Sequence, residues 1–166
     1  MKADVKRTLQ AVLWGGAAAG TADIISAIGG RGGKAVLVLQ YIASGLIGPT
    51  AVQGGWLTAA AGLAVHFGLT TIMAALFVLA ARRRPVLWQN PWPAGFVYGA
   101  LLFVIMVYGI VPHLSAAPGW KTPGGFWNNF NGAMMHGFLV GVPIACVARY
   151  FLGGRPEAQI LSTGPH

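Results

Sequence analysis

Three ionisable side chains of this sequence lie within long apolar segments. Asp23 stands in Gly20-Thr21-Ala22-Asp23-Ile24-Ile25-Ser26, and His66 and His136 stand in two later segments. An ionisable group is costly to place in such surroundings, so it marks either a functional site or a polar contact between helices. Carboxylate and imidazole groups can relay protons or bind a transition metal, and a pair of histidines can ligate a b-type haem.

The composition assigns these residues to a membrane protein. Of the 166 residues, 55% are hydrophobic and 8% are charged, whereas a soluble domain has about a quarter charged residues. The net charge of +8 comes from bases near the ends of apolar segments, which indicates membrane topology rather than a surface for polyanions. We therefore predict an integral membrane protein, with residues 1–166 as a single domain, the lipid bilayer as partner and no nucleic-acid partner.

Four segments are long enough to cross a bilayer, which needs about 20 apolar residues per helix. They are residues 8–28, 56–81, 93–112 and 128–151. A fifth apolar segment, residues 35–52, is interrupted by polar residues, glycines and a proline, which favours a re-entrant or interfacial helix. The predicted fold class is an all-α polytopic membrane helix bundle with four transmembrane helices plus one re-entrant or interfacial helix.

The basic residues favour four spans over five. With the N-terminus inside, the cytoplasmic side collects eight Lys and Arg residues against three outside, whereas a fifth span gives seven against four. Cytoplasmic loops collect such residues. We predict a multi-pass protein of the bacterial inner membrane with both termini in the cytoplasm.

Membrane anchors are expected at both boundaries. Arg82, Arg83 and Arg84 end the second span, where anionic lipid headgroups are their natural partner. Tryptophans concentrate at headgroup level in membrane proteins. The ones expected at the outer boundary are Trp56, Trp120 and Trp127, and those at the inner boundary are Trp88 and Trp92.

Helical rise lets depths be compared between spans. Asp23 lies about five residues from the outer end of its span, His66 about ten and His136 about eight, so all three are expected in the outer half of the bilayer, within roughly 7 Å of depth. Asn129 shares a helix face with His136, and His113 ends the third span on the same side. We call these five residues the polar cluster: Asp23, His66, His113, Asn129 and His136.

Small residues predict how the spans pack. Lipid provides no hydrophobic force that drives membrane helices together, so helices associate where small residues let their backbones come close. The ridges are Gly16 with Gly20, Gly95 with Gly99, and the series Ala133, Gly137, Gly141 and Ala145. Their ordinary meaning is packing within one bundle.

Four interpretations of the polar cluster remain open. Asp23, His66 and His136 could bond to each other or to nearby polar groups and so hold helices together. They could form a proton or small-ion pathway, a metal site, although no HxxxH-type pair is present, or a haem site between His66 and His136. Catalytic patterns such as GxSxG, HExxH or a paired acid are absent, so we predict no enzymatic activity.

The segment from His66 to Ala145 resembles the YagU-like family of small bacterial inner-membrane proteins. The resemblance lies in Val65-His66-Phe67-Gly68-Leu69-Thr70-Thr71-Ile72, in Leu87-Trp88-Gln89, in a Pro- and Trp-containing loop, and in Met135-His136-Gly137-Phe138-Leu139-Val140-Gly141. It covers about half of the chain and implies an inner-membrane location with four helices. The basic, proline-rich segment that follows the first helix in that family has no counterpart here. The resemblance implies no activity.

The expected role is that of a small, non-enzymatic membrane component or accessory subunit, without a cofactor. The alternative is proton or small-ion transport, or haem or metal binding, at the polar cluster.

Overall fold

A computed structural model describes residues 2–116 and 124–153, and this part of the chain is helical and contains no strand. Four helical segments are long and apolar enough to cross a membrane. Two are single helices, α1 (Lys2–Gly30) and α3 (Gly55–Arg83). The third joins α5 (Pro91–Val104), the π-helix η2 (Ile105–Ile110) and α6 (Val111–Leu114). The fourth joins α7 (Phe126–His136), the π-helix η3 (Gly137–Gly141) and α8 (Val142–Leu152). The predicted four-span fold is confirmed.

The fifth apolar segment contains a shorter apolar helix than the four spans. It forms α2 (Ala35–Ile47), a turn at Gly48 with φ of 85°, and the 3₁₀ helix η1 (Pro49–Gln53). Buried Gln40 ties α2 to the start of α3 by donating from Nε2 to the Gly55 carbonyl at 3.0 Å. Gly62 of α3 allows the close approach, because a Cβ there would overlap the Leu39 carbonyl. A short helix α4 (Val86–Gln89) links the second and third spans.

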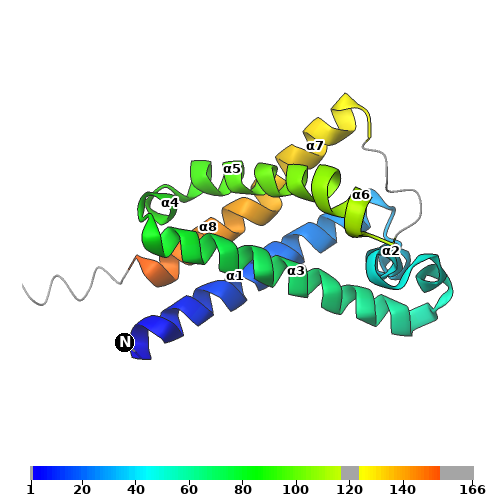
Figure 1. The fold of residues 1–166 in the computed structure, drawn as a ribbon, viewed down its shortest axis with the longest axis horizontal. Coiled ribbons are helices and arrows are strands. Elements are labelled where there is room, and N and C mark those ends of the chain that lie inside the picture. Colours follow the sequence, from blue (N-terminus) through cyan, green and yellow to red (C-terminus); the bar gives the residue numbers. More distant parts are fainter. Residues whose placement is uncertain (1, 117–123, 154–166) are drawn as a thin grey trace, which may run out of the picture.

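The bundle is held along two seams (Figure 1). In one, α1 lies against both α3 and α8, and in the other α5 lies against α7, η3 and α8. The shared core is built mostly of small and aliphatic side chains, including Ala11, Ala74, Val78, Ile144 and Ala148. Because those side chains are short, helix axes can come close together, which is the usual way in which membrane helices gain packing contacts.

The predicted glycine ridges pack within the bundle. A Cβ at Gly16 would lie 2.7 Å from the Thr71 backbone, and one at Gly20 would lie 2.8 Å from the Phe67 ring. On the second seam, Gly95 and Gly141 face each other so closely that a Cβ on Gly141 would overlap the Gly95 carbonyl. These ridges therefore set the distance between the helices.

Two π-helical segments interrupt the third and fourth spans. Each ends just before a helix whose second residue is proline, Pro112 in α6 and Pro143 in α8. Proline cannot donate a backbone hydrogen bond and crowds the preceding turn. The wider turn of a π-helix accommodates each proline. The backbone N–H of Val111 donates to the Met106 carbonyl and that of Val142 to the Gly137 carbonyl, five residues earlier in each case. Such segments are frequent at functional sites.

Candidate functional site

His66 is the most deeply buried member of the polar cluster, with 7% of its surface exposed. It projects from α3 to α1, and its Nε2 lies 2.9 Å from the Gly20 carbonyl oxygen. A carbonyl only accepts, so Nε2 carries the proton in this contact. Because Gly20 has no side chain, the Phe67 ring and the Thr70 hydroxyl of α3 fit closely beside it. The contact is a polar bond between two spans, the first of the four interpretations of the cluster.

His136 belongs to the other seam. Its Nδ1 lies 3.2 Å from the Gly132 carbonyl one turn earlier in the same helix, and its ring meets Phe103 edge-on with centroids 5.2 Å apart. Gly99 of α5 sits directly against the His136 backbone, where a Cβ would overlap its carbonyl. His136 thus contacts α5, whereas His66 contacts α1.

Asp23 is partly buried on α1, one turn beyond Gly20. It has neither a hydrogen bond nor an ion pair with any other residue among 2–116 and 124–153. No hydrogen bond or ion pair joins Asp23, His66 and His136 to one another within those ranges. A carboxyl group within a membrane span is normally partnered, so Asp23 is the cluster member with unused bonding capacity.

The remaining two members lie near the surface. Asn129 donates from Nδ2 to the carbonyl of Gly124, which lies just before α7. This bond holds the preceding loop against the first turns of the helix. His113 is exposed in the last turn of α6. Neither residue bonds to the other three within the part of the chain that the structure describes.

The described residues do not gather donors around a metal position. No group of three or more His, Cys, Asp or Glu side chains suited to an ion occurs among them. A haem iron bound by His66 Nε2 would require this nitrogen to leave the Gly20 carbonyl, because one ring nitrogen cannot donate to a carbonyl and ligate iron at once. The arrangement thus fits interhelical bonding better than it fits ligation.

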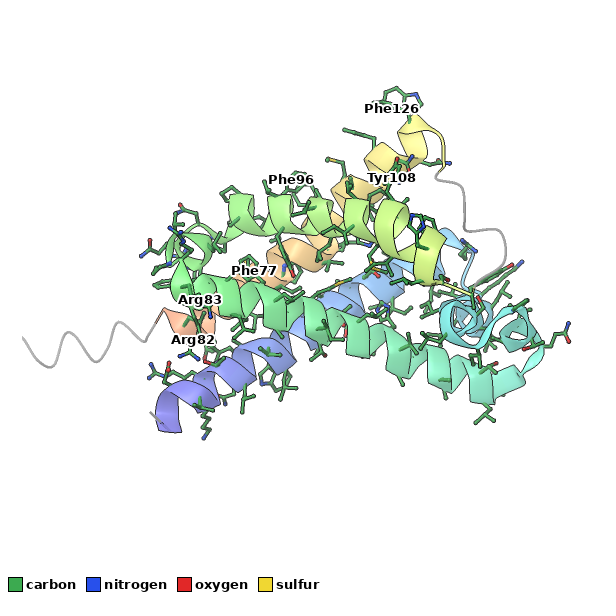
Figure 2. All side chains as sticks on the ribbon, in the orientation of Figure 1. Phe77, Arg82, Arg83, Phe96, Tyr108 and Phe126 are labelled. Atoms are coloured by element: carbon green, nitrogen blue, oxygen red, sulfur yellow. The ribbon has the colours of Figure 1, made fainter. Side chains whose placement is uncertain are left out.

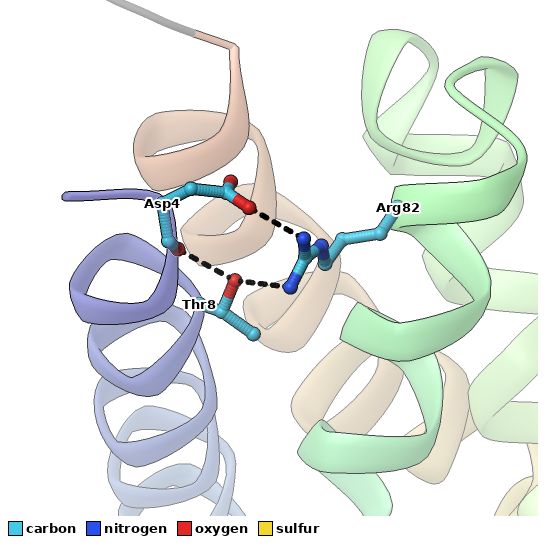
Figure 3. A network of polar contacts seen from close by, with 3 residues as sticks. All are labelled: Asp4, Thr8 and Arg82. Atoms are coloured by element: carbon cyan, nitrogen blue, oxygen red, sulfur yellow. Dashed lines mark hydrogen bonds and ion pairs between the residues drawn. The ribbon is translucent and has the colours of Figure 1, made fainter. Parts of the chain in front are cut away.

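Sequence reasoning missed a polar network at the opposite end of the bundle (Figure 3). Arg82 donates from Nη2 to Asp4 Oδ2 at 2.5 Å and from Nη1 to Thr8 Oγ1 at 3.0 Å, and Thr8 donates to the Asp4 carbonyl at 2.9 Å. The network joins the start of α1 to the end of α3. A usable signal was present, because Asp4 is the one acid near the N-terminus and three arginines end the second span.

Another missed contact holds α5 to α3. Tyr98 donates from its hydroxyl to the Met73 carbonyl at 2.7 Å, and its ring lies 5.1 Å from that of Phe77. A tyrosine in an apolar span is a common sequence feature, and nothing in its spacing indicates this partner.

The expected anchors differ in exposure. Trp56, Trp92 and Trp127 are 78%, 63% and 75% exposed, as headgroup-level rings require. Trp88 instead packs against the core beside Gly153. Arg83 and Arg84 are exposed, whereas Arg82 is engaged with Asp4. Trp120 lies outside the described residues.

Comparison with protein-family models, curated proteins and solved structures finds no match for this chain. The resemblance to the YagU-like family therefore stays a prediction.

Proposed function

We propose that this protein is a non-enzymatic accessory subunit of a larger assembly in the bacterial inner membrane, with both termini in the cytoplasm. The observation that carries the proposal is the surface of α7. Figure 1 shows α7 extending away from the other spans, and its main contacts are with α5 and η3. The first part of α7, which extends beyond α5 (Figure 1), offers a face for another helix.

The residues of this face suit a protein partner. Phe126, Trp127 and Phe130 are 73%, 75% and 49% exposed, and they contact one another as an aromatic group. Asn128 and Asn131 are exposed beside them. Asparagine amides hydrogen-bond across membrane helices, and aromatic residues are enriched at interfaces. We call these five residues the α7 face.

The engagement of the buried polar groups supports the non-enzymatic part of the proposal. His66, Tyr98 and Gln40 each bond to a backbone carbonyl of another helix. Groups committed to helix packing are poorly placed to act as acids, bases or nucleophiles, which must reach a substrate.

Site-specific photo-crosslinking in cell membranes tests the proposal. A photoreactive residue replacing Trp127 should join this protein to a second, different polypeptide. The matched control replaces Leu76, which is 56% exposed on α3 and should yield lipid adducts only. A protein adduct from neither position, or from both equally, would contradict a partner on the α7 face.

A second candidate function is proton or small-ion movement, favoured by Asp23 alone. Its carboxyl group is partly buried and lacks a bond within the described part of the chain, and it stands one turn from the carbonyl that His66 contacts. Liposomes carrying the purified protein and an internal pH dye test this. Transport through Asp23 predicts a flux that Asp23→Asn abolishes, and a flux equal to that of protein-free liposomes rejects it.

A further inference from the structure

An open apolar groove of about 460 Å³ lies between α3 and α5, with one lining residue from α4. Phe77 and Ala80 line it from α3, Leu87 from α4, and Ala94, Val97 and Tyr98 from α5. The Tyr98 hydroxyl proton is directed to the Met73 carbonyl. The groove therefore presents hydrocarbon and ring surface, and its size falls in the range of small-molecule sites, roughly 300–1,000 Å³.

Arg82, Arg83, Arg84 and Arg149 lie at the same end of the bundle as α4, together with exposed Arg7 of α1. Two of these arginines are bonded through their side chains to other residues. Arg82 bonds to Asp4 and Thr8, and Arg149 bonds to the Gln89 carbonyl at 3.3 Å. The side chains of Arg83 and Arg84 are exposed and have no hydrogen bond or ion pair with any residue that the structure describes. These two guanidinium groups are thus free to bind an anion.

The two free arginines are close in the chain to residues that line the groove. Arg84 directly follows α3, and its backbone N–H donates to the carbonyl of Ala80, which lines the groove. Leu87, which lines the groove, donates its backbone N–H to the Arg84 carbonyl at 3.0 Å. Figure 2 shows Arg83 at the α4 end of α3 and Phe77 further along the same helix, between α3 and α5. The backbone of Arg84 thus lies beside the Leu87 part of the apolar slot, with Arg83 next to it at the end of α3.

We propose that this groove is a binding site for one anionic glycerophospholipid. An acyl chain occupies the slot between α3 and α5, and the phosphate lies against Arg83 and Arg84. Basic pockets between membrane helices bind anionic headgroups in this manner. The site is separate from the α7 face, so it does not depend on the proposed subunit role.

Native mass spectrometry of the purified full-length protein, titrated with lipid in mild detergent, tests the site. The probes are phosphatidylglycerol and phosphatidylcholine with identical acyl chains, and the readout is the Kd of the first bound lipid. R83Q/R84Q should raise the Kd for phosphatidylglycerol about 30-fold, from the typical contribution of two surface cations, and leave that for phosphatidylcholine unchanged. The matched control R31Q/K34Q removes the same charge beyond the opposite end of α1 and should leave both Kd values unchanged.

A second variant tests the slot itself. Ala80 is exposed toward the groove, so A80F should fill it without disturbing the core and raise the Kd for both lipids. Helical content by circular dichroism verifies folding of each variant. Equal weakening by R31Q/K34Q and R83Q/R84Q would show general charge attraction and overturn the proposal, and so would an A80F variant that binds both lipids as the wild type does.

Discussion

His66 is joined to α1 by a single polar contact, and His66→Ala removes that contact together with the packing of the ring against Phe67. The substitution should lower the free energy of unfolding by more than the roughly 0.6–2 kcal/mol of a hydrogen bond between membrane helices, because the packing of a buried ring is lost as well. Steric trapping in detergent micelles provides the measurement. His113→Ala is the matched control, because His113 is exposed and its loss should change the unfolding free energy little. A His66→Ala protein as stable as the wild type would show that the Gly20 contact is dispensable.

Asp4 and Arg82 form an ion pair whose side chains are 60% and 38% exposed. Exposed pairs contribute little because water and salt screen them. A double-mutant cycle with Asp4→Asn and Arg82→Gln should give a coupling energy below about 1 kcal/mol, smaller at high salt. A coupling that is larger and independent of salt would show that the pair is shielded from solvent, contrary to its exposure.

The residue types of the polar cluster could be identified from the sequence, but their partners could not. Helical rise places Asp23, His66 and His136 along their axes, yet it does not fix the rotation of one helix about another. That rotation directs His66 to Gly20 and His136 to Phe103. It is set by the glycine contacts between spans, which a single sequence does not pair.

The helix contact between α5 and η3 depends on the absence of side chains at Gly95 and Gly141. Gly141→Ala should force the two backbones apart and lower the free energy of unfolding by about 1–3 kcal/mol, as overpacking does. Gly68→Ala is the matched control, because a Cβ on Gly68 of α3 meets nothing within 4 Å and alanine favours helix. Equal stability of the two variants by steric trapping would contradict the close contact at Gly141.

The long elements were predictable because span length and apolar composition are dictated by the bilayer. The segment 35–52 forms a shorter apolar helix than the four spans, in keeping with the polar residues, glycines and proline that interrupt its sequence. The π-helices η2 and η3 were not predicted. Pro112 and Pro143 indicate a local disturbance, but proline can equally cause a kink, a break or a wider turn, and packing with neighbouring helices selects among them.

At the scale of the molecule, the two ends of the bundle differ. The end with α4 is fastened by the Asp4–Thr8–Arg82 network and by Arg149, whereas at the other end α7 extends away from the core (Figure 1). Side-chain bonds join the helices at the α4 end, whereas the start of α7 extends beyond the other helices (Figure 1). The α7 face is therefore available to a neighbouring subunit.

The native mass and composition of the particle extracted from membranes in mild detergent test the accessory-subunit proposal most directly. The account predicts a particle containing this 17.3 kDa chain together with at least one different polypeptide. Replacing Phe126, Trp127 and Phe130 by serine should release the chain from that partner. Replacing the exposed Ile72, Leu76 and Leu79 by alanine should not. A wild-type particle whose protein mass is that of one chain, or of several copies of this chain alone, would contradict the account.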